Sequence, residues 1–175
     1  MDLPGTVNNR MRTLTLIRHA KSSWKDTTLS DFDRPLNKRG RENAPLMGNV
    51  LREAGVGFDL IMSSPAQRAI TTATVIAGKL GYPKKRLLEE RRLYGATVEE
   101  LLDIVHRLPD DKTHVALVAH NPGLTEFCNY LTGDNLANLP TCGIASIDLE
   151  LDTWRAVYRD TGRLTRFEYP RKYST

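Results

Sequence analysis

The sequence contains few cysteines and no long apolar segment. Its only two cysteines are Cys128 and Cys142, so we expect neither a disulfide framework nor a cysteine-rich zinc site, and both thiols should be reduced and partly buried. No apolar run approaches the roughly 20 residues that a membrane-spanning helix requires. Residues 1–10 lack the apolar core of a secretory signal peptide. Together these absences predict a cytoplasmic protein with no membrane partner.

The excess of basic over acidic residues is small. The chain has 25 lysines and arginines against 21 aspartates and glutamates, which gives a net charge of +4 at pH 7. Such an excess suits phosphate or another acidic partner. Nucleic acid is not expected, because the basic residues are spread along the chain and no nucleic-acid-binding motif accompanies them.

The length of 175 residues suits one domain with a substantial core. We expect a loose leader over residues 1–10 and a single domain over residues 11–175. Short runs rich in β-branched and leucine side chains predict buried strands, with an antiparallel set at the C-terminal end. The predicted strands span residues 12–18, 58–64, 86–88, 114–119, 143–151, 153–159 and 164–169.

Helical periodicity follows most of these strands. Asn37 is expected to cap a first helix, in which Pro45 either introduces a kink or delays the start. Thr97 and Glu100 form a capping-box pattern. The alternation predicts a three-layer α/β sandwich with a mainly parallel central sheet and helices on both faces. The predicted helices span residues 37–54 and 65–80, with a third that opens at residue 97 and a short one that ends at residue 131.

Three polar motifs come directly after predicted strands. They are Arg18-His19, the segment Ser64-Pro65-Ala66-Gln67-Arg68, and His120-Asn121. In open α/β sheets, ligands bind at the carboxyl ends of the strands. A single histidine or arginine at a strand end is more often structural than catalytic. Three coincident placements of phosphate-compatible residues instead indicate one shared site.

With these motifs the chain resembles the histidine phosphatase superfamily, whose fold is phosphoglycerate-mutase-like, and within it the small phosphohistidine phosphatases of the SixA type. Arg18-His19-Ala20 is similar to the family's Arg-His-Gly signature, with alanine in place of glycine. Ser64 to Ala69 is similar to its second motif, and His120 follows a strand as the family's second histidine does. The resemblance extends over about residues 11–150.

The resemblance implies a role for each motif residue. His19 would be the nucleophile that takes up the phosphoryl group, and His120 would be a further donor to the phosphoryl oxygens. Arg18 and Arg68 would bind phosphate through their fixed forks of donors, which a lysine cannot match. Because these groups supply the positive charge, we expect no metal and no other cofactor, and the histidines also lack zinc-ligand spacing.

Three residues of the loop between residues 20 and 36 are further candidates for the site, and two of them, Lys21 and Trp24, lie beside the nucleophile in sequence. Arg34 is a candidate third phosphate contact, and pairing with Asp31 or Asp33 is an equally good interpretation. Lys21 and Trp24 are candidates to shape the mouth of the site, although Trp24 could equally serve in ordinary packing. Long loops in compact domains are commonly functional.

The general acid is the least defined part of the predicted site. Larger relatives in the superfamily use a carboxylate after the third strand, and Glu90 is preferred over Glu89 for that role. The alternative for at least one of the two is a solvated salt bridge to Arg91 or Arg92.

The leading functional prediction is a phosphatase that removes phosphate from phosphohistidine on a protein. The chain has no large insertion that could form a lid over a small substrate, which favours an open site. The alternatives are a phosphomonoesterase for a small phosphorylated metabolite and a phosphate-recognition module without turnover. A mutase is less expected, because it must protect its intermediate from water.

Overall fold

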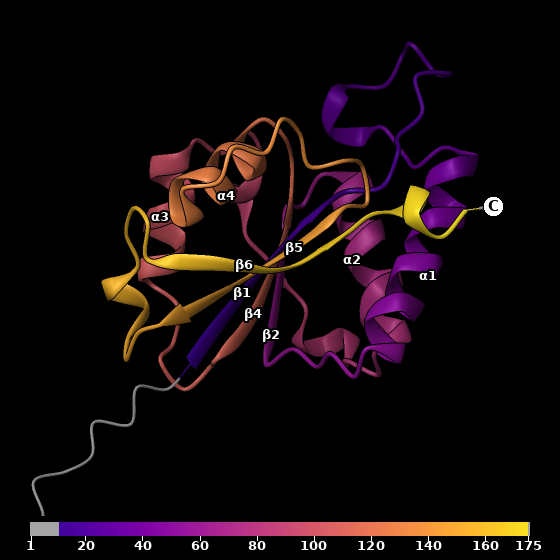
Figure 1. Cartoon of the computed structure of the whole chain (residues 1–175). Coiled ribbons are helices and arrows are strands. Elements are labelled where there is room, and N and C mark those ends of the chain that lie inside the picture. Colours follow the sequence, from indigo (N-terminus) through magenta and orange to yellow (C-terminus); the bar gives the residue numbers. More distant parts are fainter. Residues whose placement is uncertain (1–10, 175) are drawn as a thin grey trace, which may run out of the picture.

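A six-stranded sheet forms the centre of the computed structural model, which describes residues 11–174 (Figure 1). The strand order is β3-β2-β4-β1-β5-β6. Strands β1, β2, β3 and β4 are parallel to one another, whereas β5 is antiparallel to both β1 and β6. The predicted leader over residues 1–10 lies outside the described residues. The strands are β1 (Met11–Arg18), β2 (Leu60–Ser63), β3 (Leu88–Glu89), β4 (His114–Ala119), β5 (Ile144–Glu150) and β6 (Gly162–Glu168).

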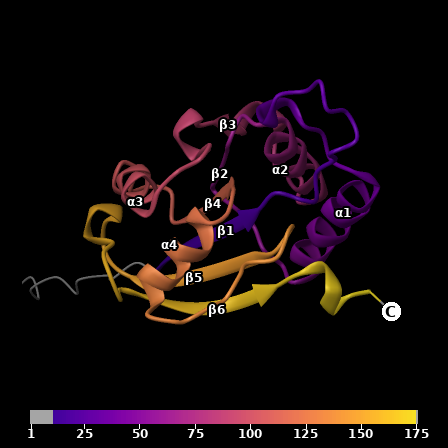
Figure 2. The same ribbon diagram turned by 90° about the horizontal axis from the view of Figure 1, so that it is seen from above.

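Helices cover both faces of the sheet, which confirms the predicted three-layer α/β sandwich. Helices α1 (Lys38–Glu53) and α2 (Gln67–Lys79) lie on one face, and α3 (Val98–His106) and α4 (Gly123–Thr132) lie on the other (Figures 1 and 2). Successive side chains of a strand point to opposite faces, so a central strand contributes to two apolar cores. In β4, Val115 and Leu117 pack in the core under α3 and α4, while Val118 packs in the core under α1 and α2.

Local sequence signals fix the starts of two helices as predicted. The Asn37 side chain accepts a hydrogen bond of 2.8 Å from the backbone N–H of Gly40, and α1 begins at Lys38 and contains Pro45. Pro45 therefore does not delay the start of this helix. The capping box at the start of α3 is present.

Helix α2 begins later than predicted. Its first residue is Gln67 rather than Pro65. The Ser64 hydroxyl accepts a hydrogen bond of 3.2 Å from the backbone N–H of Ala66, and Ala66 has an extended ψ of 138°. This local turn after β2 holds the chain out of the helical conformation.

The predicted strand over residues 153–159 is wrong. Residues Trp154–Ala156 form a 3₁₀ turn in which the indole is fully buried. The indole Nε1 donates a hydrogen bond of 2.7 Å to the Lys112 carbonyl. The apolar residues that suggested a strand instead anchor a turn in the core. Similarly, the short strand expected at residues 86–88 lies at β3, after a 3₁₀ turn at Lys84–Arg86.

The cysteines and the lengths of the helices can be compared with the expectations from the sequence. Cys128 and Cys142 are both free and buried. No helix in residues 11–174 is long and apolar enough to cross a membrane.

Candidate active site

His19 lies directly after β1, held by backbone hydrogen bonds on both sides. Its N–H donates to the Ala119 carbonyl at 3.1 Å, and its carbonyl accepts from the Cys142 N–H at 3.0 Å. The imidazole Nδ1 lies 2.7 Å from the Ala20 carbonyl oxygen, which can only accept, so Nδ1 carries the proton. In the neutral ring, Nε2 then has a free lone pair, as a nucleophile requires.

The environment of the two motif histidines keeps both rings neutral. Burial lowers the pKa of His19 to about 4; the Ala20 carbonyl opposes this shift, and the positive charge of Arg68 adds to it. Burial also lowers the pKa of His120 to about 3, assisted by the neighbouring His19 and Arg68. At neutral pH, His19 is therefore in the form that can attack phosphorus.

These pKa directions predict how the free enzyme titrates. A lowered histidine pKa means that the neutral form persists to lower pH, so both rings should remain neutral at pH 5, where an ordinary histidine with a pKa of about 6.5 is mostly protonated. Ring chemical shifts measured by NMR, assigned with His19→Ala and His120→Ala, test this expectation. Titration of the His19 ring near pH 6.5 would contradict the buried, arginine-flanked site.

His120 follows β4, the strand next to β1, and its ring meets that of His19. The two ring centroids are 5.0 Å apart. His120 Nε2 lies 2.8 Å from the Ser64 hydroxyl oxygen, at the end of β2. Its Nδ1 is buried and has no hydrogen-bond partner among the described residues. The sheet thus brings together the two histidines that are far apart in sequence.

The arginines predicted to bind phosphate converge on the same end of the sheet. Arg68 lies in the first turn of α2 and is only 5% exposed, and Arg34 is 7% exposed. Arg18 donates from Nη1 to the Leu139 carbonyl at 3.0 Å. The Nε atoms of Arg18 and Arg68 are buried without a hydrogen-bond partner in the part of the chain that the structure describes. Unsatisfied buried donors are unfavourable, and these two favour an anionic ligand.

Asp31 joins Arg34 and Arg68 into one cluster. Its Oδ1 accepts from Arg34 Nη2 at 3.0 Å, and its Oδ2 accepts from Arg68 Nη2 at 3.0 Å. Arg68 Nη1 also donates to the Asp31 backbone carbonyl at 2.6 Å. Both interpretations of Arg34 therefore meet here, because it pairs with Asp31 and also lies beside the predicted phosphate contacts.

Tyr94 completes this cluster. Its hydroxyl donates to Asp31 Oδ2 at 2.6 Å, and its ring centroid lies 5.4 Å from that of His120. The Tyr94 hydroxyl and the Arg68 and Arg34 guanidinium groups together hold the pKa of Asp31 well below its usual range. Asp31 is thus a fixed carboxylate that orients two arginine forks at the site.

Comparison with known proteins agrees with this geometry. A sequence model of the histidine phosphatase superfamily (branch 1) matches residues 14–97. The chain belongs to the histidine phosphatase superfamily. This superfamily contains both phosphatases and phosphoglycerate mutases.

Several relatives match over most of the chain. An uncharacterized chloroplastic protein of Arabidopsis thaliana is 31% identical over 86% of this chain and 72% of its own length. An uncharacterized protein of Mycobacterium tuberculosis is 31% identical over 89% of this chain and 100% of its own length. A solved structure from Agrobacterium tumefaciens, described as a candidate phosphohistidine phosphatase SixA, is 27% identical, with a TM-score of 0.77 over 91% of this chain and 98% of that one.

Glu90, the expected general acid, lies beside the end of β2, near the site. Its backbone N–H donates to the Ser63 carbonyl at 2.9 Å, next to the Ser64 that contacts His120. Its carboxylate accepts from the Arg92 backbone N–H at 3.0 Å and caps a short 3₁₀ turn. The expected salt bridge to an adjacent arginine does not form with Arg92, which pairs instead with Asp103 at 2.7 Å. The role of Glu90 as an acid stays a prediction.

Metal chemistry was not expected from the spacing of the histidines. In residues 11–174, no group of three or more histidine, cysteine, aspartate or glutamate side chains is arranged to hold a metal ion.

Sequence reasoning missed Ser64 and Tyr94 as side chains that contact the site. Ser64 lies 56 residues before His120, and Tyr94 lies 63 residues after Asp31. In the sequence, Ser64 stands only within the motif that ends at Arg68, and no pattern singles out Tyr94. No local periodicity or spacing could have linked either residue to its partner.

Proposed function

We propose that this histidine phosphatase removes phosphate from phosphohistidine on a protein, through a phosphorylated His19. The observation that carries the proposal is the state of His19 itself. It is buried and neutral, its Nδ1 is held by the Ala20 carbonyl, and it lies against His120. A phosphate-recognition module would need the arginines but not an oriented, neutral nucleophile.

In the first step, His19 Nε2 attacks the phosphorus atom. A P–N bond forms to His19 while the P–N bond to the substrate imidazole breaks, and the departing nitrogen takes its proton from solvent. The phosphoryl oxygens are bound by donors of Arg18, Arg34 and Arg68. Positioning and charge stabilisation of this kind supply nearly all of the catalysis in phosphoryl transfer.

In the second step, water attacks the phosphorylated His19. The new P–O bond replaces the P–N bond, the proton of the water passes to solvent, and inorganic phosphate leaves. His19 returns to its neutral form, because burial lowers its pKa.

Two features support a protein substrate over a small ester. The rim of the site carries exposed aromatic side chains, with Trp24 73% exposed and Phe32 37% exposed, and aromatic residues are enriched in protein interfaces. The carboxylate of Glu90 caps a turn, and an imidazole leaving group has less need of a protein acid than an alkoxide does.

We expect kcat/KM for a phosphohistidine protein to exceed that for a sugar phosphate by on the order of 100-fold, a difference of about 2.7 kcal/mol in transition-state stabilisation. The reason is that an alkoxide leaves slowly without a proton, whereas a substrate imidazole takes its proton from solvent. Initial rates of phosphate release from one substrate of each kind measure the ratio. The same assays after dialysis against a strong chelator should give unchanged rates.

Two results would overturn this proposal. Faster hydrolysis of the sugar phosphate would favour the metabolite phosphatase instead. Activity that disappears on chelation and returns with added zinc or magnesium would rule out the metal-independent mechanism.

A further inference from the structure

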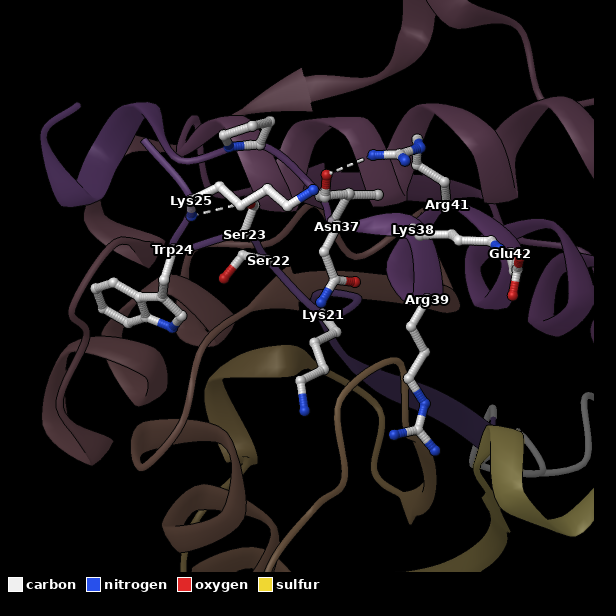
Figure 3. Close-up of a pocket in the computed structure, with 12 residues that line it drawn as sticks. Lys21, Ser22, Ser23, Trp24, Lys25, Asn37, Lys38, Arg39, Arg41 and Glu42 are labelled. Carbon is white, nitrogen blue, oxygen red and sulfur yellow. Dashed lines mark hydrogen bonds between the residues drawn. The ribbon is translucent and has the colours of Figure 1, made fainter. Parts of the chain in front are cut away.

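A cavity of about 890 Å³ lies beside the phosphate site (Figure 3). Five of its lining residues are basic and one is acidic. We call this cavity the basic groove. The residues that line it are Lys21, Ser22, Ser23, Trp24, Lys25, Pro35, Leu36, Asn37, Lys38, Arg39, Arg41 and Glu42.

Two chain segments that pair with each other form the basic groove. The Ser23 N–H donates to the Pro35 carbonyl at 2.8 Å, and the Asn37 N–H donates to the Lys21 carbonyl at 2.9 Å. The first turn of α1 packs directly on this pair, because Gly40 has no Cβ that would collide with the Lys21 backbone. The cationic side chains therefore project from a fixed scaffold.

Arg34 connects the basic groove to the phosphate site. Its guanidinium carbon lies 3.5 Å from the centroid of the Trp24 ring, and Trp24 lines the groove. Its Nη1 donates to the Ser22 hydroxyl at 2.5 Å, while its Nη2 binds Asp31 in the site. A ligand in the groove would thus lie one side chain away from a bound phosphoryl group.

The cations of the basic groove are largely uncompensated. Lys21, Lys25, Lys38 and Arg39 are exposed, and the charged group of none of them makes an ion pair or a hydrogen bond with another described residue. Within residues 11–174, the Arg41 guanidinium donates only to the Leu36 carbonyl, at 3.0 Å. With five basic residues and one acidic residue, the lining of the groove has a net charge of +4. This equals the net charge of the whole chain.

We propose that the basic groove binds acidic residues that flank the phosphohistidine of the protein substrate. This inference rests on the proposed function. Unpaired cations beside a reaction site attract an anionic partner, raise its association rate and make binding sensitive to salt. Exposed Trp24 adds a contact of the kind that anchors protein interfaces.

The distribution of charge favours a peptide segment over a small anion. The cations extend from the loop after His19 to the first turn of α1, and Figure 3 shows Lys21 and Arg39 projecting to the same side. A second cavity continues from these two residues to Arg171 near the C-terminal end. Several carboxylates of an extended chain match such a spread, whereas one compact anion reaches only a part of it.

Two phosphohistidine peptides of equal length test the inference, one flanked by aspartate and glutamate and one by serine and glutamine. At low ionic strength we expect kcat/KM for the acidic peptide to be higher by about tenfold, and we expect the preference to vanish at high salt. The double variant Lys38→Glu and Arg39→Glu should abolish the preference. An aryl phosphate needs only the phosphate site, so its hydrolysis measures the chemistry separately. Its kcat/KM should differ by less than about threefold between this variant and the wild type.

A matched control reverses the charge of Lys84 and Lys85. These residues lie in the 3₁₀ turn before β3, at the amino end of that strand. The variant Lys84→Glu and Lys85→Glu has the same net charge and should keep the preference for the acidic peptide. The groove variant should also fold normally, because acidic residues stabilise the first turn of a helix and α1 has none there.

The outcomes separate the inference from the function on which it rests. Equal turnover of both peptides, unaffected by the groove variant, overturns the docking role and leaves the phosphatase standing. If aryl phosphate is hydrolysed but neither peptide is, the proposed function itself is wrong. A small bisphosphate can be assayed in the same way. If its kcat/KM falls in the groove variant while that of neither peptide changes, the groove is a second phosphate subsite, and the inference about a protein segment is overturned.

Discussion

His19→Ala is expected to abolish turnover of every phosphate substrate, with a loss of roughly 10⁴-fold or more in kcat. The substitution removes the imidazole whose Nδ1 is held by the Ala20 carbonyl and whose Nε2 is thereby left unprotonated for attack. The fold should remain intact, because the backbone N–H and carbonyl of residue 19 make the bonds to Ala119 and Cys142. Steady-state kinetics measure the loss, and circular dichroism with thermal unfolding checks the fold.

Trapping distinguishes His19 from its neighbour as the site of phosphorylation. Quenching the wild-type enzyme with labelled substrate should yield an acid-labile, base-stable label on the peptide that contains His19. His106→Gln provides a matched control, since His106 closes α3 and its Nε2 contacts the Val157 carbonyl; it should keep wild-type turnover. Recovery of the label on His120 would reverse the assignment of the nucleophile.

The convergence of the three motifs was predictable because it follows from the topology of parallel strands. Strands β1, β4 and β2 are neighbours in the sheet and run in the same direction, so the residues that follow them meet at one edge. The strands themselves could be predicted from the sequence because each is short, apolar and buried on both faces. His19 and His120 could therefore be placed together without knowledge of any contact.

The inner network of the site was not predictable in the same way. Asp31 bonds two arginines and a tyrosine, and such contacts depend on how a long loop folds back over α2. Composition also misled at Trp154, where aromatic and β-branched residues suggested a strand. The indole lies in the core instead, because tertiary burial outweighs local strand propensity.

Arg68→Lys is expected to lower kcat/KM for an aryl phosphate by roughly 100- to 1,000-fold, the effect of losing one transition-state donor. Arg68 uses Nη1 and Nη2 at the same time, for the Asp31 carbonyl and the Asp31 carboxylate. Its remaining donors can then bind a phosphoryl oxygen in a fixed direction. A lysine ammonium is a single point charge on a flexible stem and cannot do both.

Arg92→Lys is the matched control for this substitution. Arg92 makes an ion pair with Asp103 in which both side chains are about 40% exposed, and exposed pairs contribute only about 0–1 kcal/mol, so its kinetics should match wild type. The inhibition constant of inorganic phosphate then shows at which stage Arg68 acts. If phosphate inhibits Arg68→Lys more weakly than it inhibits the wild type, Arg68 already binds phosphate in the ground state. A fall in kcat alone means that Arg68 acts mainly in the transition state. If Arg68→Lys stays within a few-fold of wild type on both measures, its bonds to Asp31 serve the fold and Arg68 does not contact phosphate.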